Sequence, residues 1–234
     1  MHRVAIIPAR GGSKRIPRKN VKEFCGKPMI AWSIEAAKAS GCFDKIIVST
    51  DDAEIAGVAK ECGATVPFLR PAELSDDFTG TLPVIRHAVE WLTDHEDPVS
   101  FACCLYATAP FVSAEDLRRG WELIQREGCS YAFSVTSYAF PIQRAVRITE
   151  NGRVAMFNPE HFQTRSQDLE EAWHDAGQFY WGAAQAWREE RPIFGEESLP
   201  VKLPRHRVQD IDTPEDWARA EWLFRAMKAE ANSQ

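Results

Sequence analysis

Short apolar runs alternate with amphipathic stretches along most of the chain. Turn residues bound each run, which is typical of short buried strands, and the runs are 4–7, 46–48, 66–69, 101–105 and 131–135. The stretches between them predict helices, at 29–39, 53–62, 82–92 and 114–126. This alternation predicts right-handed βαβ crossovers, and therefore an α/β fold in which a mostly parallel sheet has helices on both faces.

The chain departs from this alternation after residue 136. Residues 137–173 are rich in Arg, Gln, Asn and Pro and have weak periodicity, which predicts an arm that projects from the sheet; a plain surface excursion is the alternative. The pattern after this segment predicts two more strands and a closing helix, at 179–187, 208–211 and 214–228.

The composition is that of an ordinary globular protein. The 234 residues are 44% hydrophobic and 26% charged, which favours a single domain over 1–234. No apolar run is long enough for a membrane helix, and the first apolar stretch continues directly into a basic loop without a signal-peptide cleavage region, so we expect a cytoplasmic protein with no membrane partner. The six cysteines lack CxxC or Cys/His spacing, which argues against disulfides and zinc.

The loop after the first apolar run carries the strongest chemical signal. Its sequence, PARGGSKRIPRKN (8–20), has five cationic side chains, two glycines and no acid, in a chain of net charge −6. Ligands of parallel sheets bind beyond the carboxyl ends of the strands, where the loops 8–20, 49–52, 70–81 and 106–113 are expected to meet. Because a glycine-rich turn frees backbone N–H groups and the cations supply countercharge, this loop predicts a polyphosphate ligand.

Familiar phosphate-binding motifs do not account for this loop. The Gly26-Lys27 pair is followed by Pro28 where a P-loop requires Ser or Thr, and the loop does not match GxGxxG. A solvated basic loop is the alternative that an isolated basic cluster favours. Nucleic acid is not an expected partner, because the chain is acidic overall and has no basic stripe interleaved with aromatic residues.

Several longer strings resemble one enzyme family. IPARGGSKRIPRKN, GKPMIAWSIEAA, IIVSTDD, RPAEL and the late DIDTPEDW are similar to the CMP-sialic acid synthetases, the cytidylyltransferases that activate acidic sugars. Three further segments are most similar to the branch of this family that activates pseudaminic acid, namely LSDDFTGTLPV, YATAP and AWHDAGQFYWG. The resemblance implies a Rossmann-like nucleotidyltransferase fold and a homodimer whose arm, around 137–173, reaches the neighbouring subunit. It also implies that CTP reacts with a nonulosonic acid through in-line attack of the anomeric hydroxyl on the α-phosphorus, which releases pyrophosphate.

The same resemblance assigns the first loop to CTP. Arg10 and Lys19 are expected to stabilise charge on the α-phosphate and the departing pyrophosphate, which makes them the catalytic candidates. The further nucleotide contacts that it implies are Ala9, Gly11, Gly12, Ser13, Lys14, Asn20, Arg70 and Thr81. A surface ion pair with Glu73 or Asp76 is the alternative for Arg70.

The expected sugar contacts are Tyr106, Gln178, Phe179 and Tyr180. Tyr106 stands where the sialate enzymes have the glutamine of QPTSP, and a site built to hydrogen-bond one substituent discriminates strongly against another. The exchange argues against N-acetylneuraminate, while legionaminate and other acidic keto sugars stay as alternatives. Core packing is the alternative for the aromatic side chains of 179–181, since neighbouring strand residues face opposite sides.

Asp210 and Asp212 are the candidate metal ligands. At the end of a predicted strand, residues two apart lie on one side, and paired carboxylates suit Mg²⁺. Asp212 or Thr213 could instead cap the closing helix, as Asp52 is expected to cap the helix at 53–62. A catalytically silent nucleotide-binding protein is a further alternative, but it would not need the metal pair together with Arg10 and Lys19.

Overall fold

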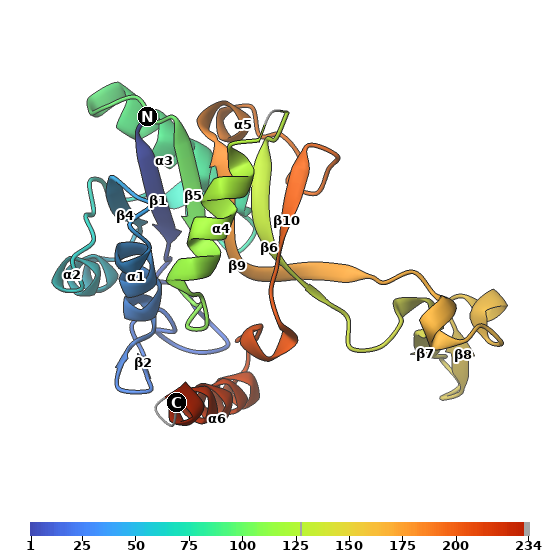
Figure 1. The fold of residues 1–234 in the computed structure, drawn as a ribbon. Coiled ribbons are helices and arrows are strands. Elements are labelled where there is room, and N and C mark those ends of the chain that lie inside the picture. The colour runs from blue at the N-terminus through green and yellow to red at the C-terminus, as the bar shows by residue number, and fades with distance from the viewer. Residues whose placement is uncertain (127, 232–234) are drawn as a thin grey trace.

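The computed structural model describes residues 1–126 and 128–231. Its centre is a six-stranded sheet in the order β10-β6-β9-β5-β1-β4 (Figure 1). β1 pairs in parallel with both β4 and β5, and β10 pairs in parallel with β6, whereas β9 runs antiparallel between β5 and β6. The strands are β1 (Arg3–Pro8), β4 (Lys45–Ser49), β5 (Phe101–Leu105), β6 (Tyr131–Ser137), β9 (Trp173–Ala183) and β10 (Ser198–Lys202). The predicted mixed α/β class, with a mostly parallel sheet, is confirmed.

Helices cover both faces of this sheet because its strands are apolar on both sides. In β1, Ala5 and Ile7 face a core shared with α1 (Met29–Ser40), α2 (Ala53–Glu61) and α4 (Ala114–Ile124). Val4 and Ile6 face the opposite core, which is shared with α3 (Thr81–His95) and α5 (Ala184–Arg188). The alternation of strand side chains thus explains why unbroken apolar runs appear in the sequence.

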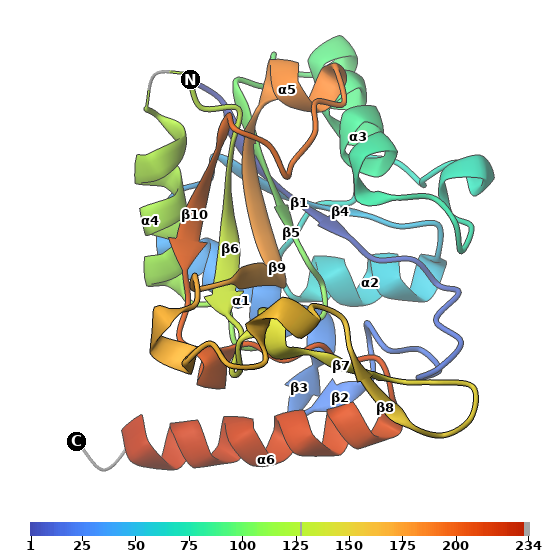
Figure 2. The same cartoon turned by 90° about the vertical axis from the view of Figure 1, so that its right-hand side faces the viewer.

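A third apolar cluster lies beyond the carboxyl ends of the parallel strands. Here α6 (Pro214–Ala231) packs on the small hairpin of β2 (Glu23–Phe24) and β3 (Lys27–Pro28), as Figure 2 shows. Phe24 meets Trp217 and Phe224 edge to face, at 5.4 Å between ring centroids in both pairs. The cluster also buries Ile16 of the basic loop and Ile211. Hydrophobic packing therefore fixes the two polar segments that carry these isoleucines.

Residues 138–172 project from the body of the molecule between β6 and β9 (Figure 1). They form a hairpin of β7 (Val146–Ile148) and β8 (Val154–Met156), with 3₁₀ turns at Ile142–Arg144, Pro159–His161 and Ser166–Asp168. Both short strands expose apolar side chains, since Val146, Ile148 and Val154 are all more than half exposed. This segment is the one that the sequence predicts to be an arm.

Some predicted elements are wrong. Residues 66–69 are not a strand, because Pro67 has no amide hydrogen and the segment contributes only an isolated bridge between Thr50 and Leu69. Residues 208–211 are irregular rather than a strand, and the strand predicted at 179–187 begins at Trp173 and gives way to α5 at Ala184. The pattern of the sequence does not predict β10, an edge strand in which Pro200 is tolerated.

Two helical glycines test how closely the helices pack on the sheet. A Cβ at buried Gly120 in α4 would lie 2.6 Å from Trp181 Cδ1 and 2.9 Å from Phe179 Cε2, whereas a Cβ at exposed Gly57 in α2 would meet nothing within 4 Å. We expect Gly120→Ala to lower the free energy of unfolding by about 1–3 kcal/mol. Gly57→Ala is the matched control and should raise it by about 0.5–1 kcal/mol, because alanine favours helix. Urea denaturation measures both; equal effects would show that α4 does not pack tightly on β9.

Candidate active site

Two adjoining clefts open at the carboxyl ends of the parallel strands. The first has a volume of about 540 Å³ and is lined by the basic loop, the 70–84 segment, Tyr106, Thr108 and Asp212. The second has a volume of about 520 Å³ and is lined by residues 174–177, 208–211 and Arg219, again with Tyr106 and Thr108. Because the two clefts share Tyr106 and Thr108, two ligands bound in them would lie against each other at the end of β5.

The cations of the basic loop converge on the first cleft. Arg10, Ser13, Lys14, Lys19 and Asn20 all line it. Arg10 Nη1 lies 2.8 Å from Asp77 Oδ1 and donates to the carbonyl of Asp76 at 2.5 Å, and Lys14 contacts the same Asp77 carboxylate. The Asp77 carboxylate, from a distant loop, thus pairs with two cations that are expected to bind phosphate.

Lys19 and Arg15 meet a second carboxylate. Lys19 Nζ donates to the carbonyl of Ile211 at 2.8 Å and to Asp212 Oδ1 at 3.1 Å. Arg15 Nη2 lies 2.8 Å from the other oxygen of Asp212. The basic loop is therefore tied directly to the candidate metal-binding segment, 192 residues away in sequence from Lys19.

The backbone of the basic loop is fixed by hydrogen bonds to its neighbours. Buried Asn20 donates from Nδ2 to the carbonyl of Arg10 at 3.0 Å, and the N–H of Gly11 donates to Asp51 Oδ1 at 3.0 Å. A Cβ at Gly11 would lie 2.7 Å from Asp52 Oδ2, so glycine lets the loop approach that carboxylate. The predicted contacts Ala9, Gly11 and Gly12 line neither cleft; Ala9 is buried in the core.

Arg18 belongs to the same basic loop but lines neither cleft, and the sequence assigns it no role. It adopts a left-handed backbone conformation with φ of 57°, which is costly for a residue with a side chain. Its guanidinium donates to both oxygens of Asp52, at 2.6 and 2.9 Å, and contacts Glu54. This pairing holds the pKa of Asp52 well below its usual range. Asp52 also caps α2 by accepting from the N–H of Ile55 at 3.0 Å, so its predicted capping role is confirmed.

Arg70 is a buried cation at the wall of the first cleft. Its Nε donates to Ser75 Oγ at 3.2 Å, and its Nη2 lies 3.8 Å from Asp51 Oδ1 with no hydrogen-bond partner among the described residues. Burial lowers the pKa of this guanidinium, and the nearby Asp51 partly opposes the shift. A buried donor without a partner suits an anionic or oxygen-rich ligand. The alternative of a surface ion pair with Glu73 or Asp76 is wrong.

A chain of polar side chains runs from the first cleft to the second. Thr81 Oγ1 and the Tyr106 hydroxyl lie 3.0 Å apart, and the rings of Tyr106 and Tyr180 lie 5.4 Å apart. The Tyr180 hydroxyl donates to Asp175 Oδ2 at 2.5 Å. Burial raises the pKa of both tyrosines, so they are neutral hydrogen-bonding groups near neutral pH.

Three of the four predicted sugar contacts, Gln178, Phe179 and Tyr180, line neither cleft. Phe179 is fully buried in the core beneath α4 and lines neither cleft, because neighbouring residues of β9 face opposite sides. Gln178 is also buried, and its Nε2 donates to the carbonyl of Arg207 at 2.5 Å, just ahead of the candidate metal-binding segment. Core packing, the alternative reading of Phe179, therefore describes that residue better.

The candidate metal ligands Asp210 and Asp212 lie at the boundary between the clefts. Ile211 is buried between them, and its neighbours line the second and the first cleft respectively. Burial and the nearby Asp212 raise the pKa of the Asp210 carboxyl. Thr213 caps α6, since its Oγ1 accepts from the N–H of Asp216 at 3.2 Å while Asp216 accepts from the N–H of Thr213 at 2.9 Å. Asp212 is therefore free of the capping role.

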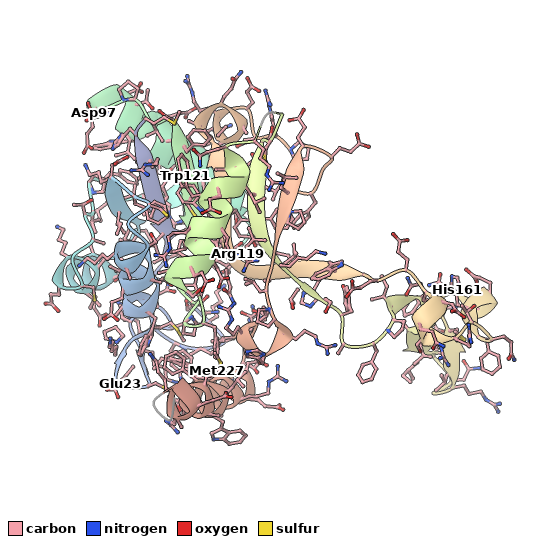
Figure 3. The ribbon with its side chains drawn as sticks, viewed as in Figure 1. Glu23, Asp97, Arg119, Trp121, His161 and Met227 are labelled. Carbon is pink, nitrogen blue, oxygen red and sulfur yellow. The ribbon has the colours of Figure 1, made fainter. Side chains whose placement is uncertain are left out.

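A buried ion cluster holds the segment that leads to these carboxylates. Asp116, at the first turn of α4, is almost fully buried and accepts from Arg207 at 2.5 Å and from Arg119 at 2.9 Å. Arg119 is labelled in Figure 3. Because an unpaired charge at Asp116 would be costly, this cluster fixes residues 205–207 against α4. Sequence reasoning missed it, since nothing in the local pattern links residues 91 positions apart.

Comparisons with known proteins identify the family of this chain. A family model for cytidylyltransferases matches residues 4–212. The chain is 46% identical over 225 residues to the pseudaminic acid cytidylyltransferase of Campylobacter jejuni, covering 96% of this chain and 97% of that protein. It is 35% identical to the CMP-N,N'-diacetyllegionaminic acid synthase of Legionella pneumophila, covering 96% and 97% of the two chains.

Similar folds occur among solved structures. A CMP:2-keto-3-deoxy-manno-octonic acid synthetase complexed with CTP superposes with a TM-score of 0.70, at 16% identity, over 97% of this chain and all of that one. The 4-diphosphocytidyl-2C-methyl-D-erythritol synthase of Anaerococcus prevotii gives a TM-score of 0.61 at 14% identity, over 96% and 98% of the two chains. These structures share the fold, and the sequence matches confirm the family resemblance: the chain belongs to the cytidylyltransferases, a family of CTP-dependent nucleotidyltransferases.

Proposed function

We propose that this chain is a Mg²⁺-dependent enzyme that joins CTP to pseudaminic acid, giving CMP-pseudaminic acid and pyrophosphate. The observation that carries the proposal is the pair of clefts that meet at Tyr106 and Thr108, with a basic loop in the first and two carboxylates at the boundary. A nucleotide in the first cleft would present its α-phosphate to a sugar in the second. The choice of sugar rests on the Campylobacter jejuni relative and on Tyr106.

The first cleft suits a triphosphate because its cations already hold anions. Arg10 and Lys14 pair with Asp77, and Lys19 pairs with Asp212. Incoming phosphates would compete with these carboxylates for cations that are already positioned around the cleft. Arg70 contributes a buried donor without a partner in the described part of the chain.

The reaction itself needs little from the protein besides position and charge. The anomeric oxygen forms a bond to the α-phosphorus while the bond from that phosphorus to the bridging oxygen breaks, so the β- and γ-phosphates leave as pyrophosphate. The proton of the anomeric hydroxyl group passes to solvent. Arg10 and Lys19 face the reacting phosphate and stabilise the charge that develops on it and on the leaving group.

The residues at the boundary fit a magnesium ion that arrives with the nucleotide. The described residues contain no group of three or more His, Cys, Asp or Glu that could hold a metal by themselves. Two carboxylates, Asp210 and Asp212, suit Mg²⁺ nevertheless, because this ion is commonly bound by one or two carboxylates together with substrate phosphates and water. When bound, it would neutralise phosphate charge and lower the pKa of the attacking hydroxyl.

The arm has the character of an interface with a second copy of the chain. Phe140, Ile148, Val154, Phe157 and Phe162 are all exposed, at 61–83% of their possible area. Single exposed apolar residues are common, but a group of this size on one projecting segment marks an interaction surface. No described helix is both long enough and apolar enough to span a bilayer. A homodimer would bury these apolar side chains in both subunits, because a two-fold interface uses the same surface of each partner.

The dimer is testable at the most exposed of these side chains. Phe140→Ser is expected to raise the dimer dissociation constant at least about tenfold, since burial of the ring would be lost in both subunits. Trp222→Ser in α6, also an exposed aromatic but outside the arm, serves as the control and should leave the constant unchanged. Light scattering across a concentration series measures both; a monomeric parent protein would refute the dimer.

Substrate preference tests the proposed function. Pseudaminic acid is a deoxygenated sugar with two acylamino groups, and Tyr106 offers it apolar area and one hydroxyl group. Pyrophosphate release with CTP is expected to show at least a roughly tenfold higher kcat/KM for pseudaminic acid than for N-acetylneuraminate, and Tyr106→Gln should narrow that ratio. Equal or better turnover of N-acetylneuraminate or legionaminate would defeat the substrate assignment, and no release with any of them would defeat the function.

Metal titration tests the two boundary carboxylates. Asp210→Asn and Asp212→Asn should each raise the Mg²⁺ concentration for half-maximal rate at least about tenfold, because a neutral amide is a poorer ligand. Asp94→Asn, on the exposed surface of α3, is the control. Thermal unfolding of the variants shows whether the fold is intact. Titration curves that coincide with that of the parent protein would remove both residues from the metal site.

A further inference from the structure

Asp175 is held at the edge of the second cleft by an irregularity in β9. The pairing of β9 with β6 shifts register between Phe133 and Val135, and Gly177 adopts a left-handed conformation with φ of 61°. Such bulges often re-aim a side chain next to an active site. Asp175 is exposed and lines the second cleft, although residues 178–182 of the same strand are buried.

Two donors fix the Asp175 carboxylate in this position. The Tyr180 hydroxyl donates to Oδ2 at 2.5 Å, and the N–H of Gly177 donates to Oδ1 at 2.9 Å. Tyr180 is itself only 2% exposed and lies against Tyr106, so it cannot swing away from the carboxylate. A carboxylate has about four lone-pair sites, and the two donors occupy two of them. The remaining acceptor sites are available to a ligand in the second cleft.

The charges of the second cleft set the orientation of an acidic sugar. Its lining carries two carboxylates, Asp175 and Asp210, with Arg219 as the one arginine or lysine among its described residues. In a nonulosonic acid the carboxylate and the anomeric hydroxyl share one carbon atom, so the hydroxyl that reaches the first cleft brings the carboxylate with it. The neutral acylamino and hydroxyl groups then face the rest of the second cleft, where Asp175 would repel an anion and accept from N–H or O–H.

We infer that Asp175 is a sugar-binding residue, which accepts a hydrogen bond from an acylamino N–H or a hydroxyl group of the acid sugar. This inference rests on the proposed function and assigns Asp175 a part in recognition of the acceptor alone. The chain from Thr81 through Tyr106 and Tyr180 to Asp175 would then couple the walls of the two clefts mechanically, without a role for Asp175 in binding CTP.

The test measures the effect of a substitution at Asp175 on the sugar and on CTP separately. Asp175→Asn keeps the size of the side chain but removes its charge, and kcat/KM for pseudaminic acid should fall at least about tenfold, while KM for CTP stays within about twofold. Tyr180→Phe removes the donor that orients Asp175 and should cause a smaller loss in the same direction. Asp97→Asn is the control; Asp97 lies at the end of the sheet away from the clefts (Figure 3) and should match the parent protein.

Each outcome decides for or against the inference. An unchanged kcat/KM for the sugar in Asp175→Asn would overturn the inference. A rise in KM for CTP as large as the loss of kcat/KM for the sugar would also overturn it, because it would indicate a general structural role. The parent protein must release pyrophosphate with a nonulosonic acid in the same assay. If it does not, the proposed function fails, whereas a normal parent and an unaffected variant refute the role of Asp175 alone.

Discussion

Charge neutralisation of the basic loop is the constraint on which the site depends. Five cations within residues 10–19 would repel one another in the absence of partners. Carboxylates from three distant segments neutralise these cations. Asp52 pairs with Arg18, Asp77 with Arg10 and Lys14, and Asp212 with Lys19 and Arg15. These ion pairs are partly exposed, so their contribution to folding stability is small. Their consequence is geometric, since the pairs with Asp77 and Asp212 hold four of the five cations around the first cleft.

Apolar packing turns this charge pattern into a fixed arrangement. Ile16 and Ile211 are buried in the same cluster, with Phe24 and Trp217, and each belongs to a segment that otherwise carries charge. The third fixed point is the buried Asp116, which holds Arg207 against α4. With these anchors the basic loop and the Asp210–Asp212 segment meet across the chain. The boundary between the clefts is therefore built by the hydrophobic core beneath it.

The sequence predicts the layered fold well because the parallel strands are buried on both faces and leave unbroken apolar runs. The prediction of strands fails where a proline lies in an edge strand, as at Pro200. It also fails to give the correct bounds of β9, which runs antiparallel to its neighbours. Candidate site residues on the first loop could be found from charge and glycine content. Arg18, Asp116 and Asp175 could not, because their roles arise from partners far along the chain, or from a bulge that no local pattern reveals. Phe179 shows the converse, since an aromatic side chain that the family resemblance assigns to the sugar faces the core.

We propose that Asp77 takes the place of phosphate at Arg10 and Lys14, and CTP binding tests this most directly. Calorimetric titration of the parent protein and of Asp77→Asn should show tighter binding of CTP to the variant, by about threefold to tenfold, because the triphosphate no longer competes with a carboxylate for Arg10 and Lys14. Cytidine, which has no phosphates, should bind both proteins equally. Weaker or unchanged binding of CTP to Asp77→Asn would contradict the claim that phosphates replace this carboxylate.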